Sequence, residues 1–118
     1  MTDMQRIAEQ YLASWNAAPA ERSLTLSAWS EDATYVDPLM SASGRAAIGL
    51  MMDQAVVNFP GHAFMLSGAV DGHGPYVRFS WTLAAPDAKA VAHGTDVVRV
   101  DSEDRIAEVI GFLNGDGS

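Results

Sequence analysis

The stretch Val91-Ala-His-Gly-Thr-Asp-Val-Val-Arg-Val100 is rich in β-branched residues, and a second β-prone segment follows at 105–113 after the turn-forming Asp101-Ser-Glu-Asp104. This pattern predicts two strands joined by a tight turn. Successive strand residues point to opposite faces, so Asp96 projects from a face that otherwise carries alanine, glycine and valine. A carboxylate aimed at an apolar core is costly unless it is paired, hydrogen-bonded or protonated. Asp96 is therefore the first candidate functional residue.

Length and composition favour one globular domain spanning residues 1–118. Hydrophobic residues make up 48% of the chain and charged residues 19%, which is ordinary for a folded protein. The absence of cysteine excludes disulfides and thiol chemistry. A net charge of −8 disfavours binding to nucleic acid or to anionic membranes. With no long apolar run and no signal-peptide pattern, we expect a soluble cytoplasmic protein.

The rest of the chain predicts helices first and strands later. Apolar residues at helical spacing indicate helices over about 2–16 and 45–58, with a shorter one starting at Pro19 and ending near Glu31. Short strands are expected at 33–36, 62–70 and 76–83, in addition to the two at the end of the chain. An α+β domain follows, with three helices from the N-terminal half packed on a curved, mainly antiparallel sheet.

Tyr11 and Asp37 are two further candidates. Tyr11 lies in the middle of the apolar stripe of the first helix, where it is either a core aromatic residue or a hydroxyl presented to a cavity. Asp37 precedes Pro38, which biases it toward extended backbone. An Asp-Pro pair is more often a turn starter than a catalytic base. If Asp37 and Asp96 line one apolar cavity, their environments can drive their pKa values apart and permit proton transfer near neutral pH.

Other chemistries have little support in the sequence. His62, His73 and His93 are widely spaced and form no zinc-binding motif, so we expect no metal. We expect no cofactor either, because phosphate-binding glycine loops are absent, and no serine-nucleophile motif occurs.

Four segments, 11–16, 32–38, 44–48 and 93–98, together resemble the NTF2-like superfamily, in particular its SnoaL-like and ketosteroid isomerase-like branches. The resemblance covers essentially the whole chain. It implies a cone-shaped fold in which three helices close over a bent sheet and leave an apolar pocket. It also implies a homodimer formed through the outer face of the sheet.

By this resemblance Asp37 matches the general base of ketosteroid isomerases. Tyr11 and a protonated Asp96 match their oxyanion hole. The activity implied is proton transfer alpha to the carbonyl of a small apolar molecule, as in an isomerase or polyketide cyclase. We expect the substrate pocket to be lined by Trp15, Met52, Phe59, Val98 and Phe112.

Two departures from the isomerase pattern are visible. The region that supplies a supporting tyrosine in those enzymes reads Leu50-Met-Met-Asp53 here, which argues against a steroid substrate. Arg99 and Asp101 only loosely match the Asp-Arg-Asp set of related epoxide hydrolases, and Arg99 has the wrong face parity. The alternative to an enzyme is a ligand-binding or dimerisation module that uses the same residues without catalysis.

Overall fold

The computed structural model describes residues 3–114, which form three helical segments against one six-stranded sheet. In chain order the elements are α1 (Met4–Asn16), the 3-10 turn η1 (Pro19–Glu21), α2 (Arg22–Thr25), η2 (Leu26–Ala28), β1 (Trp29–Val36), β2 (Ser41–Ser43), α3 (Arg45–Asn58), β3 (Ala63–His73), β4 (Tyr76–Ala84), β5 (Ala90–Val100) and β6 (Ile106–Leu113). The α+β architecture is confirmed. None of the described helices is long and apolar enough to cross a membrane.

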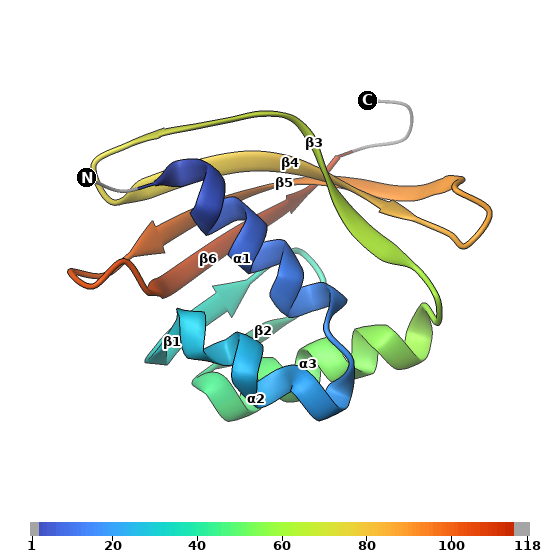
Figure 1. The fold of residues 1–118 in the computed structure, drawn as a ribbon, viewed down its shortest axis with the longest axis horizontal. Coiled ribbons are helices and arrows are strands. Elements are labelled where there is room, and N and C mark those ends of the chain that lie inside the picture. Colours follow the sequence, from blue (N-terminus) through green and yellow to red (C-terminus); the bar gives the residue numbers. More distant parts are fainter. Residues whose placement is uncertain (1–2, 115–118) are drawn as a thin grey trace.

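The sheet has the strand order β2-β1-β6-β5-β4-β3 and is open at both edges. All neighbouring strands are antiparallel except β1 and β6, which run parallel, so the sheet is mixed. Register shifts in β3, near Gly68 with its positive φ of 83°, and at the ends of β4 and β5 bend the long strands. Figure 1 shows β3 arching over one end of α1, so the sheet curves around the helix.

Helix α1 lies across the concave face of the sheet and supplies the centre of the core. Its N-terminus is capped by Asp3, whose carboxylate accepts a hydrogen bond from the backbone N–H of Arg6 at 3.0 Å. The buried face of α1 comprises Ile7, Ala8, Tyr11, Leu12, Ser14 and Trp15. Helix α3 packs against β1 and β2 beside α2 (Figure 1). The prediction for α3 matches its observed bounds; in the first helix, Thr2 lies outside the described residues.

The predicted second helix is wrong in its extent. Residues 19–28 form one α-helical turn between two 3-10 turns, and β1 already begins at Trp29. Trp29 is fully buried, and its indole N–H donates to Ser14 Oγ at 3.0 Å. Burial of this large side chain against α1 therefore overrides the helical spacing that 24–29 displays in the sequence.

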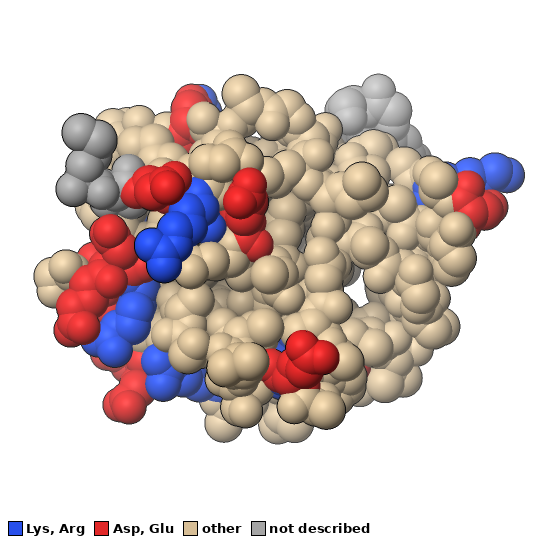
Figure 2. Space-filling model, in the orientation of Figure 1, with Lys and Arg blue, Asp and Glu red and all other residues tan. Residues whose placement is uncertain are grey.

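Charged side chains are unevenly spread over the surface. On the face seen in Figure 2, acidic and basic residues are interspersed at the end of the molecule where the β5–β6 turn lies, with another group at the tip of the β4–β5 hairpin. Most of the surface between them is uncharged on this face. The acidic excess of the chain is therefore not one continuous anionic surface here.

Candidate functional site

A cavity of about 180 Å³ lies between α1, the C-terminal part of α3 and the concave face of the sheet. Three of its lining residues are the candidates Tyr11, Asp37 and Asp96, and the predicted pocket residues Trp15 and Phe59 line it as well. The fold thus brings together, around one cavity, a hydroxyl and two carboxyls that are up to 85 residues apart in sequence. Its remaining walls are predominantly apolar.

Asp96 points from the concave face of the sheet toward the cavity, as strand alternation predicts, and only 3% of its surface is exposed. The Tyr11 hydroxyl lies 2.5 Å from Asp96 Oδ2 and donates to it when Asp96 is ionised. The indole N–H of Trp81 donates to Asp96 Oδ1 at 3.1 Å. Burial raises the pKa of Asp96, the nearby charge of Asp37 raises it further, and the two hydrogen bonds oppose this rise. A protonated Asp96 would itself be a hydrogen-bond donor inside the cavity.

Asp37 lies at the end of β1 and is only half-buried. Its Oδ1 accepts hydrogen bonds from the backbone N–H groups of Leu39 and Met40, at 2.7 and 2.9 Å. Its Oδ2 accepts from the Tyr35 hydroxyl at 2.5 Å. The turn after Asp37 therefore fixes the carboxylate, while Oδ2 keeps a second lone pair for a ligand. Asp37 therefore both starts the turn and lines the cavity.

Each of the two carboxyls accepts a hydrogen bond from a tyrosine hydroxyl, Asp96 from Tyr11 and Asp37 from Tyr35. Burial, followed by the charge of Asp96, raises the pKa of Tyr11 well above its ordinary value. Burial and the hydrogen bond to Asp37 raise the pKa of Tyr35 likewise. Both phenols therefore stay protonated and act as hydrogen-bond donors throughout the physiological pH range.

Two glycines make room for this arrangement. A Cβ on Gly111 would lie 3.0 Å from Asp96 Oδ1 and 3.1 Å from Asp37 Cβ, so Gly111 occupies the narrow space between the two carboxyl residues. A Cβ on Gly94 would lie 2.3 Å from the Trp81 ring. Glycine at these two strand positions allows the carboxyls to approach each other and the indole to reach Asp96.

Residues 8–109 match the SnoaL-like domain. The chain belongs to the SnoaL-like family. None of the curated proteins matches it significantly.

A solved structure similar to this SnoaL-like protein is that of a candidate isomerase of the same family from Agrobacterium tumefaciens. It is 47% identical, with a TM-score of 0.93 over 98% of this chain and 100% of that one. A SnoaL-like protein of unknown function from Burkholderia thailandensis is 15% identical, with a TM-score of 0.78 over 98% and 99% of the two chains. A candidate polyketide cyclase from Sinorhizobium meliloti is 15% identical, with a TM-score of 0.72 over 90% and 93%. The last two likenesses concern the fold alone.

Three residues predicted to line the pocket of this SnoaL-like protein lie elsewhere. Met52 is fully buried on the side of α3 that faces Arg22, whose guanidinium lies 3.7 Å from its sulfur. Val98 is fully buried in the core, opposite Val77 and Val109. Phe112 is 53% exposed on the outer face of the sheet, because its neighbour Gly111 occupies the inner face beside Asp96.

Three residues of the SnoaL-like site are not among those predicted from the sequence: Tyr35, Trp81 and Gly111. Tyr35 and Asp37 are two residues apart in extended backbone, so their side chains point to the same face. Trp81 lies on the same face of β4 as Phe79, which is paired with Asp96. A glycine inside the final strand signals a close approach of other groups. These signals were present in the sequence, but only the strand register shows which residues meet.

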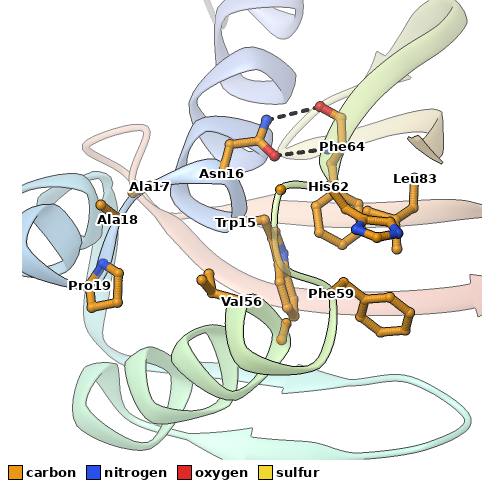
Figure 3. Close-up of a pocket in the computed structure, with 12 residues that line it drawn as sticks. Trp15, Asn16, Ala17, Ala18, Pro19, Val56, Phe59, His62, Phe64 and Leu83 are labelled. Atoms are coloured by element: carbon orange, nitrogen blue, oxygen red, sulfur yellow. Dashed lines mark hydrogen bonds between the residues drawn. The ribbon is translucent and has the colours of Figure 1, made fainter. Parts of the chain in front are cut away.

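A second cavity, of about 290 Å³, adjoins the first and shares Trp15, Ala55, Phe59, Phe64 and Leu83 with it. Figure 3 shows Trp15 and Phe59 bordering this space, with His62 near Phe64. The Asn16 side chain makes two hydrogen bonds to the backbone of Phe64, at 2.8 and 2.9 Å, and so ties the end of α1 to β3 (Figure 3).

The environment of Asp96 makes stability depend on pH. Because the folded-state pKa of Asp96 is raised above its ordinary value of 3.8, the folded protein holds this proton more tightly than the unfolded chain does. The resulting stabilisation is complete below about pH 4 and is lost as pH rises through the raised pKa. We therefore expect the difference in free energy of unfolding between wild type and Asp96→Asn to decline with rising pH.

Urea unfolding of both proteins between about pH 4 and about pH 8 measures this difference. Comparing the two proteins cancels the contributions that the other carboxyls make to the pH dependence of stability. These include Asp71 and Asp101, whose pKa values are lowered by hydrogen bonds. A difference that stays flat would mean that folding leaves the pKa of Asp96 unchanged, and one that grows with pH would mean that folding lowers it; either result would contradict the prediction.

Proposed function

We propose that this SnoaL-like protein is an isomerase or cyclase-type enzyme that transfers a proton alpha to a carbonyl group. The observation that carries the proposal is the convergence of two carboxyls in unlike environments on one apolar cavity. Asp37 is half-buried and hydrogen-bonded by backbone amides, whereas Asp96 is buried and has a raised pKa. Two carboxyls in such different environments are suited to act one as a base and the other as an acid.

In the proposed mechanism Oδ2 of Asp37 removes a proton from the carbon alpha to the carbonyl. The electron pair of the broken C–H bond moves toward the carbonyl oxygen and generates an enolate. The Tyr11 hydroxyl and protonated Asp96 donate hydrogen bonds to that oxygen, at the point where negative charge develops. In an isomerisation, Asp37 then returns the same proton to the γ-carbon, so no cofactor is consumed.

Cavity size limits the substrate of this reaction. Pockets for drug-sized ligands measure about 300–1,000 Å³, whereas the cavity beside Asp37 and Asp96 measures about 180 Å³. A monocyclic β,γ-unsaturated ketone suits this space better than a four-ring steroid. We expect the protein to convert the monocyclic ketone to its conjugated isomer and to convert the steroid analogue much more slowly.

Ultraviolet absorbance of the conjugated product measures both rates. Faster turnover of the steroid would contradict the size argument, because the cavity would then have to open widely. Absence of turnover across ketones of both sizes would count against proton transfer and favour the second reading, in which the same cavity binds a ligand without changing it.

We also propose that two copies associate through the outer face of the sheet. Four side chains on this face are large, apolar and well exposed: Met65, Val91, Ile110 and Phe112, with exposed fractions of 57%, 50%, 38% and 53%. Exposed apolar side chains rimmed by polar ones mark interfaces in many proteins. A monomeric mass in sedimentation equilibrium at micromolar protein would contradict this proposal.

A further inference from the structure

The walls of the cavity beside Asp37 and Asp96 are unusually rich in aromatic rings. Six of the lining residues are aromatic: Tyr11, Trp15, Tyr35, Phe59, Phe64 and Trp81. Ring centroids lie 5.6 Å apart for Trp15 and Tyr35, 5.5 Å for Trp15 and Phe64, and 5.3 Å for Phe64 and Trp81. The corresponding planes are inclined by 60°, 54° and 76°. The planes of neighbouring rings are therefore steeply inclined to one another, and the rings are not stacked face to face.

The charge of this cavity has one sign. Its lining includes two acidic residues, Asp37 and Asp96, and no lysine, arginine or histidine. Both carboxyls have only neutral hydrogen-bond partners, namely tyrosine, tryptophan and backbone N–H groups. By contrast, Asp53, Asp71, Asp101, Glu103 and Glu108 each form an ion pair with an arginine. Among residues 3–114, no ion pair compensates the negative charge of the cavity.

The aromatic rings and the carboxylate of Asp37, which has only neutral hydrogen-bond partners, together favour a cation. A cation over a ring face is attracted by the electron-rich π system, and this attraction is strongest where water is excluded. A carboxylate or phosphate ligand would instead meet repulsion from Asp37 and would find no cationic partner in the lining. A compact ligand is required, because a cavity of about 150 Å³ holds a molecule the size of benzene.

We propose that this cavity binds a small alkylammonium ion, with its N-methyl groups against the aromatic walls and its charge facing Asp37. The inference goes beyond the proposed proton transfer and does not depend on turnover. It names the ligand chemistry that the walls recognise, whether the cation is a separate ligand or a group carried by the substrate.

The test is calorimetric titration with choline and with its neutral isostere, in which a tert-butyl group replaces the trimethylammonium group. The two ligands have nearly the same shape, so their comparison isolates the charge. At about 0.15 M salt, which screens surface charges, we expect choline to bind at least tenfold more tightly. Equal or tighter binding of the isostere, or no heat with millimolar choline, would overturn the proposal.

Two variants show whether the preference arises in this cavity. Asp37→Asn keeps the acceptor for the backbone amides but removes the charge, and Phe64→Leu removes one ring while preserving an apolar side chain. Each should weaken choline severalfold and leave the isostere nearly unchanged. Asp32→Asn, at an exposed position of β1, the strand that precedes Asp37, changes the net charge equally and should have no effect.

If Asp32→Asn weakens choline as much as Asp37→Asn does, the preference comes from the overall acidity of the protein and the proposal fails. Because calorimetry requires no reaction, its result is separate from ketone turnover. A protein that isomerises ketones but does not prefer choline would contradict this inference alone. A protein that prefers choline without turnover would contradict only the proposed enzyme activity.

Discussion

Asp37→Asn should lower turnover of a monocyclic β,γ-unsaturated ketone by about a thousandfold, within the range expected for loss of a general base. An amide nitrogen in place of Oδ2 has no lone pair to take the α-proton, while the remaining oxygen still accepts from Leu39 and Met40. The measurement is the ultraviolet rate at saturating ketone, compared with that of wild type.

Stability is the control for this variant. The hydrogen bond from Tyr35 to Asp37 Oδ2 must rearrange, which should cost no more than about 1.5 kcal/mol in free energy of unfolding. A small rate effect accompanied by a large loss of stability would identify Asp37 as a structural residue. The base would then have to be sought elsewhere in the cavity, with Asp96 as the remaining carboxyl.

Asp53→Ala should lower the free energy of unfolding by about 3 kcal/mol, near the lower end of the range for breaking a buried ion pair. Arg22 Nε lies 2.9 Å from Asp53 Oδ1, and only 6% of the Arg22 side chain is exposed. Two other nitrogens of Arg22 donate to the backbone carbonyls of Ser14 and Ala17. Removing Asp53 leaves this guanidinium buried without its counter-charge. The 36% exposure of Asp53 keeps the effect below that of a fully buried pair.

Asp71→Ala provides the matched control for that prediction. Asp71 also pairs with an arginine, Arg78, at 2.7 Å, but both side chains are about 60% exposed. Its removal should leave the free energy of unfolding nearly unchanged, because water and salt screen an exposed pair. Urea unfolding of the two variants and wild type compares them directly. Equal losses for the two variants would contradict the importance of burial at Arg22.

Sequence periodicity was sufficient for the long elements and insufficient for the short ones. Helix α1 and the strands β4 and β5 display periods of 3.6 or 2 residues, and these patterns reflect the faces they bury. The helical spacing of the segment 19–28 does not continue as predicted, because Trp29 is buried as the first residue of β1 and the helical turns end at Ala28. The brief strand β2 and the parallel pairing of β1 with β6 depend on contacts between distant segments, which local patterns do not encode.

The same difference between local sequence patterns and contacts of distant segments applies to the candidate site. Alternation along β5 sufficed to place Asp96 inside, because a single face of a single strand determined it. Tyr35 and Trp81 could not be assigned in the same way, since their roles depend on which residues of other strands they meet. Phe112 is predicted to line the pocket but lies on the outer face of the sheet. Strand alternation indicates this orientation: because Gly111 makes room beside Asp96 on the inner face, its neighbour must point outward.

Exchange of the α-hydrogens of a small cyclic ketone with deuterated water, followed by proton NMR, tests the central claim most directly. It detects proton removal even when the ketone is not the natural substrate. We predict that wild type accelerates the exchange above the buffer rate and that Asp37→Asn does not. Exchange at the buffer rate with wild type, for ketones that demonstrably bind in the cavity, would contradict proton transfer as the function of this site.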